Sequence, residues 1–230
     1  MKAVLVAGGA GAVGEGIVRG FLANGWEALV PSRSLKHLDE LRERLGFPEH
    51  LKTFESDLTS PEQTELSAAV KGHDLAAAVV SVGGWWQGAN LIDVDLETWN
   101  GVLAKVLTSH FMVCKAVVPH LKARLGDASL TLIGGNASEE PVAGAGPTSI
   151  AGAAQIMLSR VLALELGSTP VRVNELVMGP VATRKVTDPG PNWITPDDVG
   201  CACEKLAADG KTRGEVIRIY DALMLRNRFG

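Results

Sequence analysis

Short apolar runs alternate along this chain with longer segments in which apolar residues recur at helical spacing. An apolar run without polar interruption is typical of a strand that is covered on both faces of a parallel sheet. Such runs predict strands at residues 3–7, 26–31, 51–55, 74–82, 129–133, 171–177 and 215–220. The segments between them predict helices at 12–23, 35–45, 61–71, 96–124, 147–166 and 196–208, the fourth of which is broken near its start. This alternation predicts an α/β fold with one doubly wound parallel sheet and helices on both faces.

The composition fits one globular domain over residues 1–230. A chain of 230 residues can bury a substantial core, and 46% hydrophobic with 21% charged residues is typical of a globular protein. No repeat, linker or shift in composition divides the chain. The net charge of -4, without a basic run, gives no support to a nucleic-acid partner.

Targeting and metal-binding signals are also missing from the sequence. Strand-like residues begin directly after Met1 and Lys2, which leaves no room for a signal peptide, and no stretch reads as apolar and uncharged enough to span a bilayer. Cys201 and Cys203 point in different directions on a predicted helix, so they make a poor metal pair. With Cys114 they suggest no disulfide framework. We therefore expect a cytoplasmic protein with no membrane partner and no metal.

A glycine-rich turn after the first predicted strand carries the clearest functional signal. That strand leads into Gly8, Gly11 and Gly14, which fall at even spacing. The first glycine suits a tight turn, the second allows backbone to approach a pyrophosphate, and the third allows a helix to pack close to the strand. A helix that starts near Ala12 and Val13 directs its free N–H groups at the phosphates. These five residues predict a dinucleotide-binding site.

Further motifs follow this loop in a fixed order. Together with it, they resemble segments of the short-chain dehydrogenase/reductase family over nearly the whole chain, at residues 57–59, 79–84, 99–121, 171–174, 178–183, 195–199 and 214–217. The resemblance implies an NAD(P)-binding Rossmann fold and an oxidoreductase activity. It also implies that the cofactor is contacted, from the adenine side to the nicotinamide side, by Asp57, Leu58, Ser81, Val82, Gly83, Pro180 and Val181.

The end of the second predicted strand favours NADP over NAD. Members that prefer NAD usually carry an acid there, which binds the ribose hydroxyls. Here the strand leads into Ser32, Arg33 and Ser34, so the acidic position holds Ser32. Without a carboxylate the repulsion of a 2′-phosphate is gone, and the Arg33 guanidinium can bind that phosphate with two hydrogen bonds. The alternative is that Arg33 is a solvated charge at the start of the next helix.

The residues that carry the family's chemistry are replaced in this chain. The family uses a Tyr whose pKa is lowered by a Lys four residues later, a Ser that holds the substrate carbonyl, and an Asn that holds a water. The matching positions hold, in that order, Thr148, Gly152, Gly135 and Val106. An aliphatic hydroxyl is a much poorer acid than a phenol with a pKa of ~10, and glycine offers no cation. The one tyrosine, Tyr220, lies in the last predicted strand, so we expect no carbonyl reduction by the usual route.

Three polar residues remain as catalytic candidates near the expected nicotinamide site: Ser138, Glu139 and Thr148. A carboxylate such as Glu139 can act as a general base, although a solvated loop face is its commoner role. On the loop after the fourth strand, Trp85 and Trp86 can stack on a planar small-molecule ligand. Packing under the loop or at a subunit contact explains the two tryptophans equally well.

Three functions stay open at this point. The first is an NADP-dependent oxidoreductase that takes its proton from water or an unusual acid. The second is a catalytically silent protein that binds nucleotide and acts as a scaffold. The third is a non-redox isomerase or lyase with Glu139 or Glu140 as base. The predicted helices at 96–124 and 147–166 are too apolar to face water on any side. We therefore expect a homodimer or a homotetramer.

Overall fold

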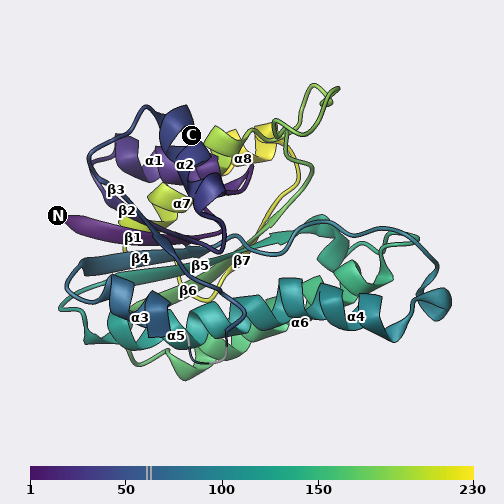
Figure 1. The fold of residues 1–230 in the computed structure, drawn as a ribbon, viewed down its shortest axis with the longest axis horizontal. Helices are drawn as coiled ribbons and strands as arrows, with labels where there is room; N and C mark the ends of the chain where they lie inside the picture. Colours follow the sequence, from purple (N-terminus) through teal and green to yellow (C-terminus); the bar gives the residue numbers. More distant parts are fainter. Residues whose placement is uncertain (61, 63) are drawn as a thin grey trace.

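The computed structural model describes every residue of the chain except Pro61 and Gln63. In the described part, seven parallel strands form one sheet in the order β3-β2-β1-β4-β5-β6-β7 (Figure 1). The strands are β1 (Lys2–Ala7), β2 (Glu27–Ser32), β3 (Leu51–Glu55), β4 (Asp74–Val80), β5 (Ala128–Gly135), β6 (Val171–Met178) and β7 (Val216–Ile219). The strand order reverses between β1 and β4, and open sheets of this kind bind ligands at the carboxyl ends of the strands near such a point.

Helices cover both faces of the sheet, as the alternating pattern predicted (Figure 1). One face carries α1 (Gly14–Ala23), α2 (Leu35–Leu45), α7 (Pro196–Ala208) and α8 (Ala222–Phe229). The other face carries α3 (Thr64–Val70), α5 (Ser109–Ala123) and α6 (Gly146–Glu165), and α4 (Leu96–Leu103) packs on α6. A buried apolar cluster lies on each side of the sheet, so the predicted α/β fold class is confirmed.

Two elements differ from the prediction. The expected break in the long central helix is a π-helical turn (Ala104–Thr108) that joins α4 to α5 without interrupting the helix. Helix α8 was not predicted; Asp221 caps it by accepting a hydrogen bond of 2.8 Å from the Met224 N–H, a local signal that the sequence did contain. The predicted helix start at Pro61 lies outside the described residues.

The continuous helix formed by α4, the π-helical turn and α5 is long and apolar enough to cross a membrane by length and composition. The expectation that no such stretch exists is therefore wrong by this criterion. The same helix packs on the sheet through Val113, Val117 and Leu121, which are buried in the apolar cluster of that face. Core helices pass the same test of length and composition.

Helices α1 and α7 meet through glycines, with no side chain between them. A Cβ at Gly16 would lie 2.1 Å from the carbonyl oxygen of Pro196, and a Cβ at Gly200 would lie 2.1 Å from the carbonyl oxygen of Gly16. A Cβ at Gly20 would lie 2.7 Å from the carbonyl carbon of Gly200. The two helix backbones are therefore in direct contact, and only glycine fits at these positions.

This contact predicts the cost of adding one methyl group. Gly16→Ala should lower the free energy of unfolding by about 1–3 kcal/mol, because the helices must separate to accommodate the Cβ. The matched control is Gly101→Ala on α4, where a Cβ meets nothing within 4 Å, and where alanine should raise the helix stability by up to about 1 kcal/mol. Urea unfolding of both variants at one protein concentration measures the difference, and equal effects would contradict it.

Candidate functional site

Two neighbouring cavities lie at the carboxyl ends of the strands. The first cavity has a volume of about 670 Å³ and is lined by the loops that follow β1, β2, β3 and β4. The predicted cofactor residues that line it are Gly8, Gly11, Ala12, Ser32, Arg33, Asp57, Leu58, Ser81, Val82 and Gly83. The second cavity has a volume of about 630 Å³, and Val82 lines both. The structure thus brings segments that are far apart in the sequence to one crevice.

The glycine loop is shaped by two close backbone contacts. Gly8 has a φ of +84°, and a Cβ there would lie 2.1 Å from the carbonyl oxygen of Ser81 at the end of β4. A Cβ at Gly14 would lie 2.1 Å from the carbonyl oxygen of Gly8. Gly11 donates its N–H to the same carbonyl at 2.9 Å and lines the first cavity. The spacing of the three glycines thus reflects tight turn geometry at the entrance of α1.

Five of the predicted cofactor residues do not line the first cavity. Gly14 lies behind the loop, and Val13 packs against the apolar cluster under α1. The Ser34 hydroxyl caps α2 by accepting a hydrogen bond of 3.3 Å from the His37 N–H. Pro180 and Val181 line the second cavity instead.

Basic side chains outside the predicted set also line the first cavity. Lys105 reaches it from the π-helical turn, and Arg184 and Lys185 reach it from the loop after β6. Arg184 also pairs with the buried Glu15 carboxylate at 2.8 Å, and Arg44 binds the same oxygen at 2.7 Å. The basic pair just after the predicted nicotinamide-side loop was a signal in the sequence that could have identified two of these residues.

Two acidic residues, Glu40 and Asp57, line the first cavity. The Thr59 backbone N–H and hydroxyl hold the pKa of the Asp57 carboxyl below its ordinary value, by hydrogen bonds of 2.9 and 2.7 Å. Asp57 is therefore a charged acceptor at neutral pH. Glu40 also lines this cavity, whereas the end of β2 itself offers Ser32 and Arg33.

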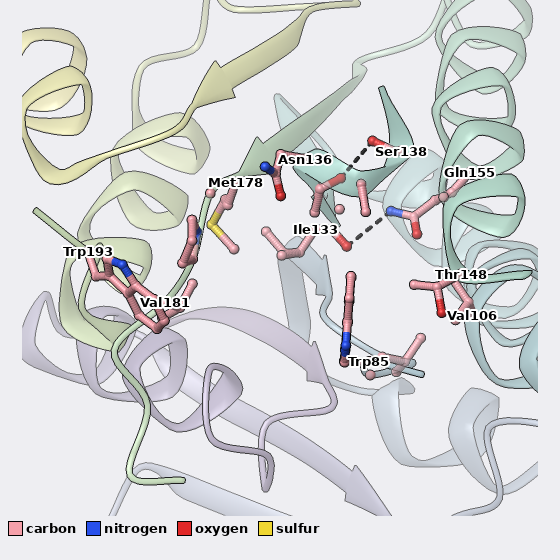
Figure 2. Close-up of a pocket in the computed structure, with 18 of the residues that line it drawn as sticks. Trp85, Val106, Ile133, Asn136, Ser138, Thr148, Gln155, Met178, Val181 and Trp193 are labelled. Carbon is pink, nitrogen blue, oxygen red and sulfur yellow. Dashed lines mark hydrogen bonds between the residues drawn. The ribbon is translucent and has the colours of Figure 1, made fainter. Parts of the chain in front are cut away.

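The second cavity collects the positions at which the family's catalytic residues were expected. Val106, Gly135, Thr148 and Gly152 all line it. Ser138 and Asn136 line it as well, and Figure 2 shows them with Val106 and Thr148. The rest of its wall is mainly apolar. No charged side chain appears among the described residues that line it.

The three catalytic candidates are held in different ways. Ser138 donates its hydroxyl to the Gly135 carbonyl at 2.7 Å, and Thr148 donates its hydroxyl to the Trp86 carbonyl at 2.9 Å. Glu139 does not line the second cavity; its carboxylate accepts hydrogen bonds of 2.8 and 2.6 Å from Arg218 and one of 3.1 Å from the Tyr220 hydroxyl. The Arg218 hydrogen bonds lower the pKa of Glu139, which makes it a poor base.

The two tryptophans of the loop after β4 have different surroundings. Trp85 lines the second cavity and is 58% exposed, whereas Trp86 packs against Val102, Val106 and Ala151 under the loop. Of the two, only Trp85 lines the cavity, and a ligand contact there stays a prediction. Trp193, which was not predicted, lines the same cavity from the segment before α7 (Figure 2).

Two buried titratable groups lie beneath this crevice. Burial lowers the pKa of His110 on α5 to about 4, and its Nδ1 contacts the Val106 carbonyl at 2.5 Å. Burial raises the pKa of Glu175 on β6 to about 7, and its Oε1 accepts a hydrogen bond of 3.2 Å from the Gln155 side chain. The structure therefore buries an imidazole whose pKa lies below its ordinary value and a carboxyl group whose pKa lies above its ordinary value.

Residues 2–191 match the family model described as short chain dehydrogenase. The chain belongs to this family. Short-chain dehydrogenases use NAD(P), so membership implies a nicotinamide cofactor. Among the described residues there is no group of His, Cys, Asp or Glu that could hold a metal ion.

Curated relatives are between a quarter and a third identical to this short-chain dehydrogenase over the matched residues. The mouse (Mus musculus) dehydrogenase/reductase SDR family member 4 is 29% identical over 189 residues, which cover 80% of this chain and 67% of the relative. The bovine (Bos taurus) protein of the same name is 27% identical over 188 residues, which cover 79% and 66%. The chain thus spans about two thirds of the length of these relatives.

Solved structures agree with the fold of this short-chain dehydrogenase. An oxidoreductase of the family from Burkholderia thailandensis is 25% identical, with a TM-score of 0.84 over 98% of this chain and 93% of that one. A short-chain type dehydrogenase/reductase from Mycobacterium ulcerans is 23% identical, with a TM-score of 0.87 over 97% and 90%. The second likeness concerns the fold alone.

The two buried groups predict opposing effects of pH on stability. The folded pKa of His110 lies below its unfolded value, so its contribution is lost as the pH falls from about 6.5 toward 4. The folded pKa of Glu175 lies above its unfolded value, so its contribution is regained as the pH falls from about 7 toward 4.5. The two contributions nearly cancel between pH 7 and pH 5.

Removing one of these two groups should therefore reveal the pH dependence of stability that the other group causes. When the pH falls from 7 to 5, the free energy of unfolding of Glu175→Gln should decrease by about 2 kcal/mol more than that of the parent protein. That of His110→Gln should instead increase relative to the parent protein. Urea unfolding at both pH values measures these slopes, in which the constant cost of each substitution cancels. Parallel slopes in all three proteins would show that neither group titrates as inferred.

Proposed function

We propose that this chain is an NADP(H)-dependent oxidoreductase with a non-standard active site. The observation that carries the proposal is the lining of the second cavity, which adjoins the expected cofactor site. This lining includes Val106, Gly135, Thr148 and Gly152, at the positions where the resemblance assigns the family's Asn, Ser, Tyr and Lys. The described lining holds neither a tyrosine nor a lysine.

The residues of the first cavity fit a dinucleotide with an extra phosphate. Gly8 leaves its backbone close to the strand end, where no Cβ could be placed without meeting Ser81. Arg33, Arg184 and Lys185 supply cations on its wall, and the end of β2 carries no carboxylate. These features favour a 2′-phosphate over a free ribose hydroxyl.

The bound cofactor supplies or accepts a hydride. The Ser138 and Thr148 hydroxyls can hold a carbonyl or hydroxyl oxygen of the substrate, because a hydroxyl that donates to the backbone still accepts. Neither hydroxyl is acidic enough to protonate a product alkoxide near neutral pH. We infer that water entering the open second cavity supplies this proton, and that a small-molecule ligand lies beside Trp85.

A catalytically silent, nucleotide-responsive protein is the second candidate. It is favoured by the same replacement of four catalytic residues beside a preserved glycine loop. An isomerase or lyase that uses Glu139 as base is a weaker third candidate, because that carboxylate is bound by Arg218 and Tyr220 and lies outside the cavity lining.

Titration of NADPH and NADH into the protein tests the cofactor. Tryptophan quenching and nucleotide fluorescence should show NADPH binding at least tenfold more tightly than NADH. Arg33→Ala should remove most of this preference, because a charge-assisted hydrogen bond contributes about 1.5–3 kcal/mol. The matched control is Lys36→Ala, a basic residue of α2 that does not line the cavity. A preference that survives Arg33→Ala would overturn the role given to Arg33.

Turnover separates the first two candidates. NADPH oxidation is followed by absorbance over a panel of carbonyl, imine and enone compounds. Activity that falls on Ser138→Ala or Thr148→Val supports the oxidoreductase. Tight NADPH binding without turnover over the whole panel supports the silent protein.

We also propose that the protein forms a homodimer or homotetramer through α5 and α6. Large apolar side chains are exposed there, at Phe111, Ile150, Met157, Val161 and Leu164. The four on α6 share one helix face by their spacing. An exposed apolar face of this kind marks a contact surface.

Light scattering at micromolar concentration should give a multiple of the 24.2 kDa chain mass. Met157→Lys should shift the protein toward monomer, because a buried lysine charge without a partner is costly. Leu125→Lys is the control, since Leu125 is 95% exposed and lies beyond the end of α5. A monomer mass for the parent protein would contradict the proposal.

A further inference from the structure

The amide of Gln155 is fixed by two acceptors at the buried end of the second cavity. Its Nε2 donates to the Ile133 carbonyl at 3.1 Å and to the Glu175 carboxylate at 3.2 Å. A backbone carbonyl can only accept, so the NH₂ group must face Ile133. Both amide hydrogens are then used, and the amide oxygen is the polar atom that Gln155 offers to the cavity it lines (Figure 2).

Glu175 is placed to hold this orientation. The residue is fully buried on β6, and its Oε1 would lie 2.9 Å from a Cβ at Gly134, so the absence of a side chain at Gly134 gives the carboxylate its space. Turning the Gln155 amide over would place its oxygen against the Ile133 carbonyl, which can only accept, and would lose that hydrogen bond. Leaving such buried groups unpaired is costly, so the amide oxygen is a fixed acceptor.

Two other polar side chains of the cavity, Ser138 and Thr148, donate their hydroxyl hydrogens elsewhere. The Ser138 and Thr148 hydroxyls donate to backbone carbonyls, as described above, and lie nearer the site of hydride exchange by the family resemblance. The remaining wall includes Trp85, Trp193 and Ile133. A charged ligand would find no counter-charge on this described wall and would be costly to bury.

We propose that Gln155 is a specificity-determining residue, whose amide oxygen accepts a hydrogen bond from a hydroxyl or N–H group of an uncharged, mainly apolar ring compound. Glu175 is the positioning residue that holds the amide. Trp85 and Trp193 supply flat apolar surface for the ring. This inference rests on the proposed function, because it names the substrate class of the same site.

A pair of probes that differ in one donor tests the inference. The protein saturated with NADPH, and the protein alone, are titrated by calorimetry with 4-propylphenol and with 4-propylanisole, in which a methyl group replaces the donated hydrogen. The parent protein should bind the phenol at least tenfold more tightly, because the anisole leaves the Gln155 oxygen buried without a partner.

Variants locate the source of this preference. Gln155→Met keeps the length of the side chain and should bring the two affinities within about threefold of one another. Glu175→Leu should weaken the preference several-fold, whereas Glu175→Gln should retain it, because a Gln oxygen can still accept from the Gln155 amide. The rescue by glutamine distinguishes positioning from simple packing. NADPH affinity, measured in each sample, shows whether a variant has folded.

The outcomes separate this inference from the proposed function. Equal affinities of the parent protein for both probes, a preference unchanged by Gln155→Met, or no binding of either probe would overturn the inference while leaving NADPH binding intact. Failure of the parent protein to bind NADPH would overturn the proposed function instead. In that case the titrations without nucleotide still decide the role of Gln155.

Discussion

The backbone contact between Gly8 and the Ser81 carbonyl is the constraint on which both cavities depend. Gly8 follows β1 and Ser81 follows β4, so the contact fixes the separation of the two strand ends at the reversal of strand order. The Ser81 N–H also donates to the Ala7 carbonyl at 2.9 Å, which ties the strand ends from the other side. Val82 follows directly and lines both cavities. One contact thus positions the wall that the two sites share.

Local sequence signals were sufficient for the fold and for most of the first cavity. The alternation of apolar runs and helical periods gave the α/β class because each parallel strand must be buried on both faces and each crossover requires a helix. The glycine loop, Ser32 with Arg33, and Asp57 with Leu58 each directly follow a strand, so their meeting at one end of the sheet followed from topology alone. Ser34 and Val13 also follow strands but do not line the cavity, because Ser34 caps α2 and Val13 packs against the apolar cluster under α1.

The second cavity could not be predicted in the same way. Its character depends on contacts between residues distant in sequence, such as Gln155 on α6 with Glu175 on β6, or Glu139 with Arg218 on β7. From the sequence alone, a loop carboxylate such as Glu139 can be interpreted as a base or as a solvated charge, because its partner is not known. Trp85 and Trp86 are adjacent in sequence, yet only a folded loop decides which of them turns toward the ligand side.

The glycine contact between α1 and α7 has a mechanical consequence. Helix α1 begins at the phosphate-side loop, and α7 begins directly after the segment that carries Trp193 to the second cavity. Because backbone touches backbone at Gly16 and Gly200, no side chain can repack to let one helix slide on the other. The two helices are therefore fixed against each other. The segment between β6 and α7 is thus anchored at its carboxyl end by α7 and at its start by the pairing of Val181 with Ile194.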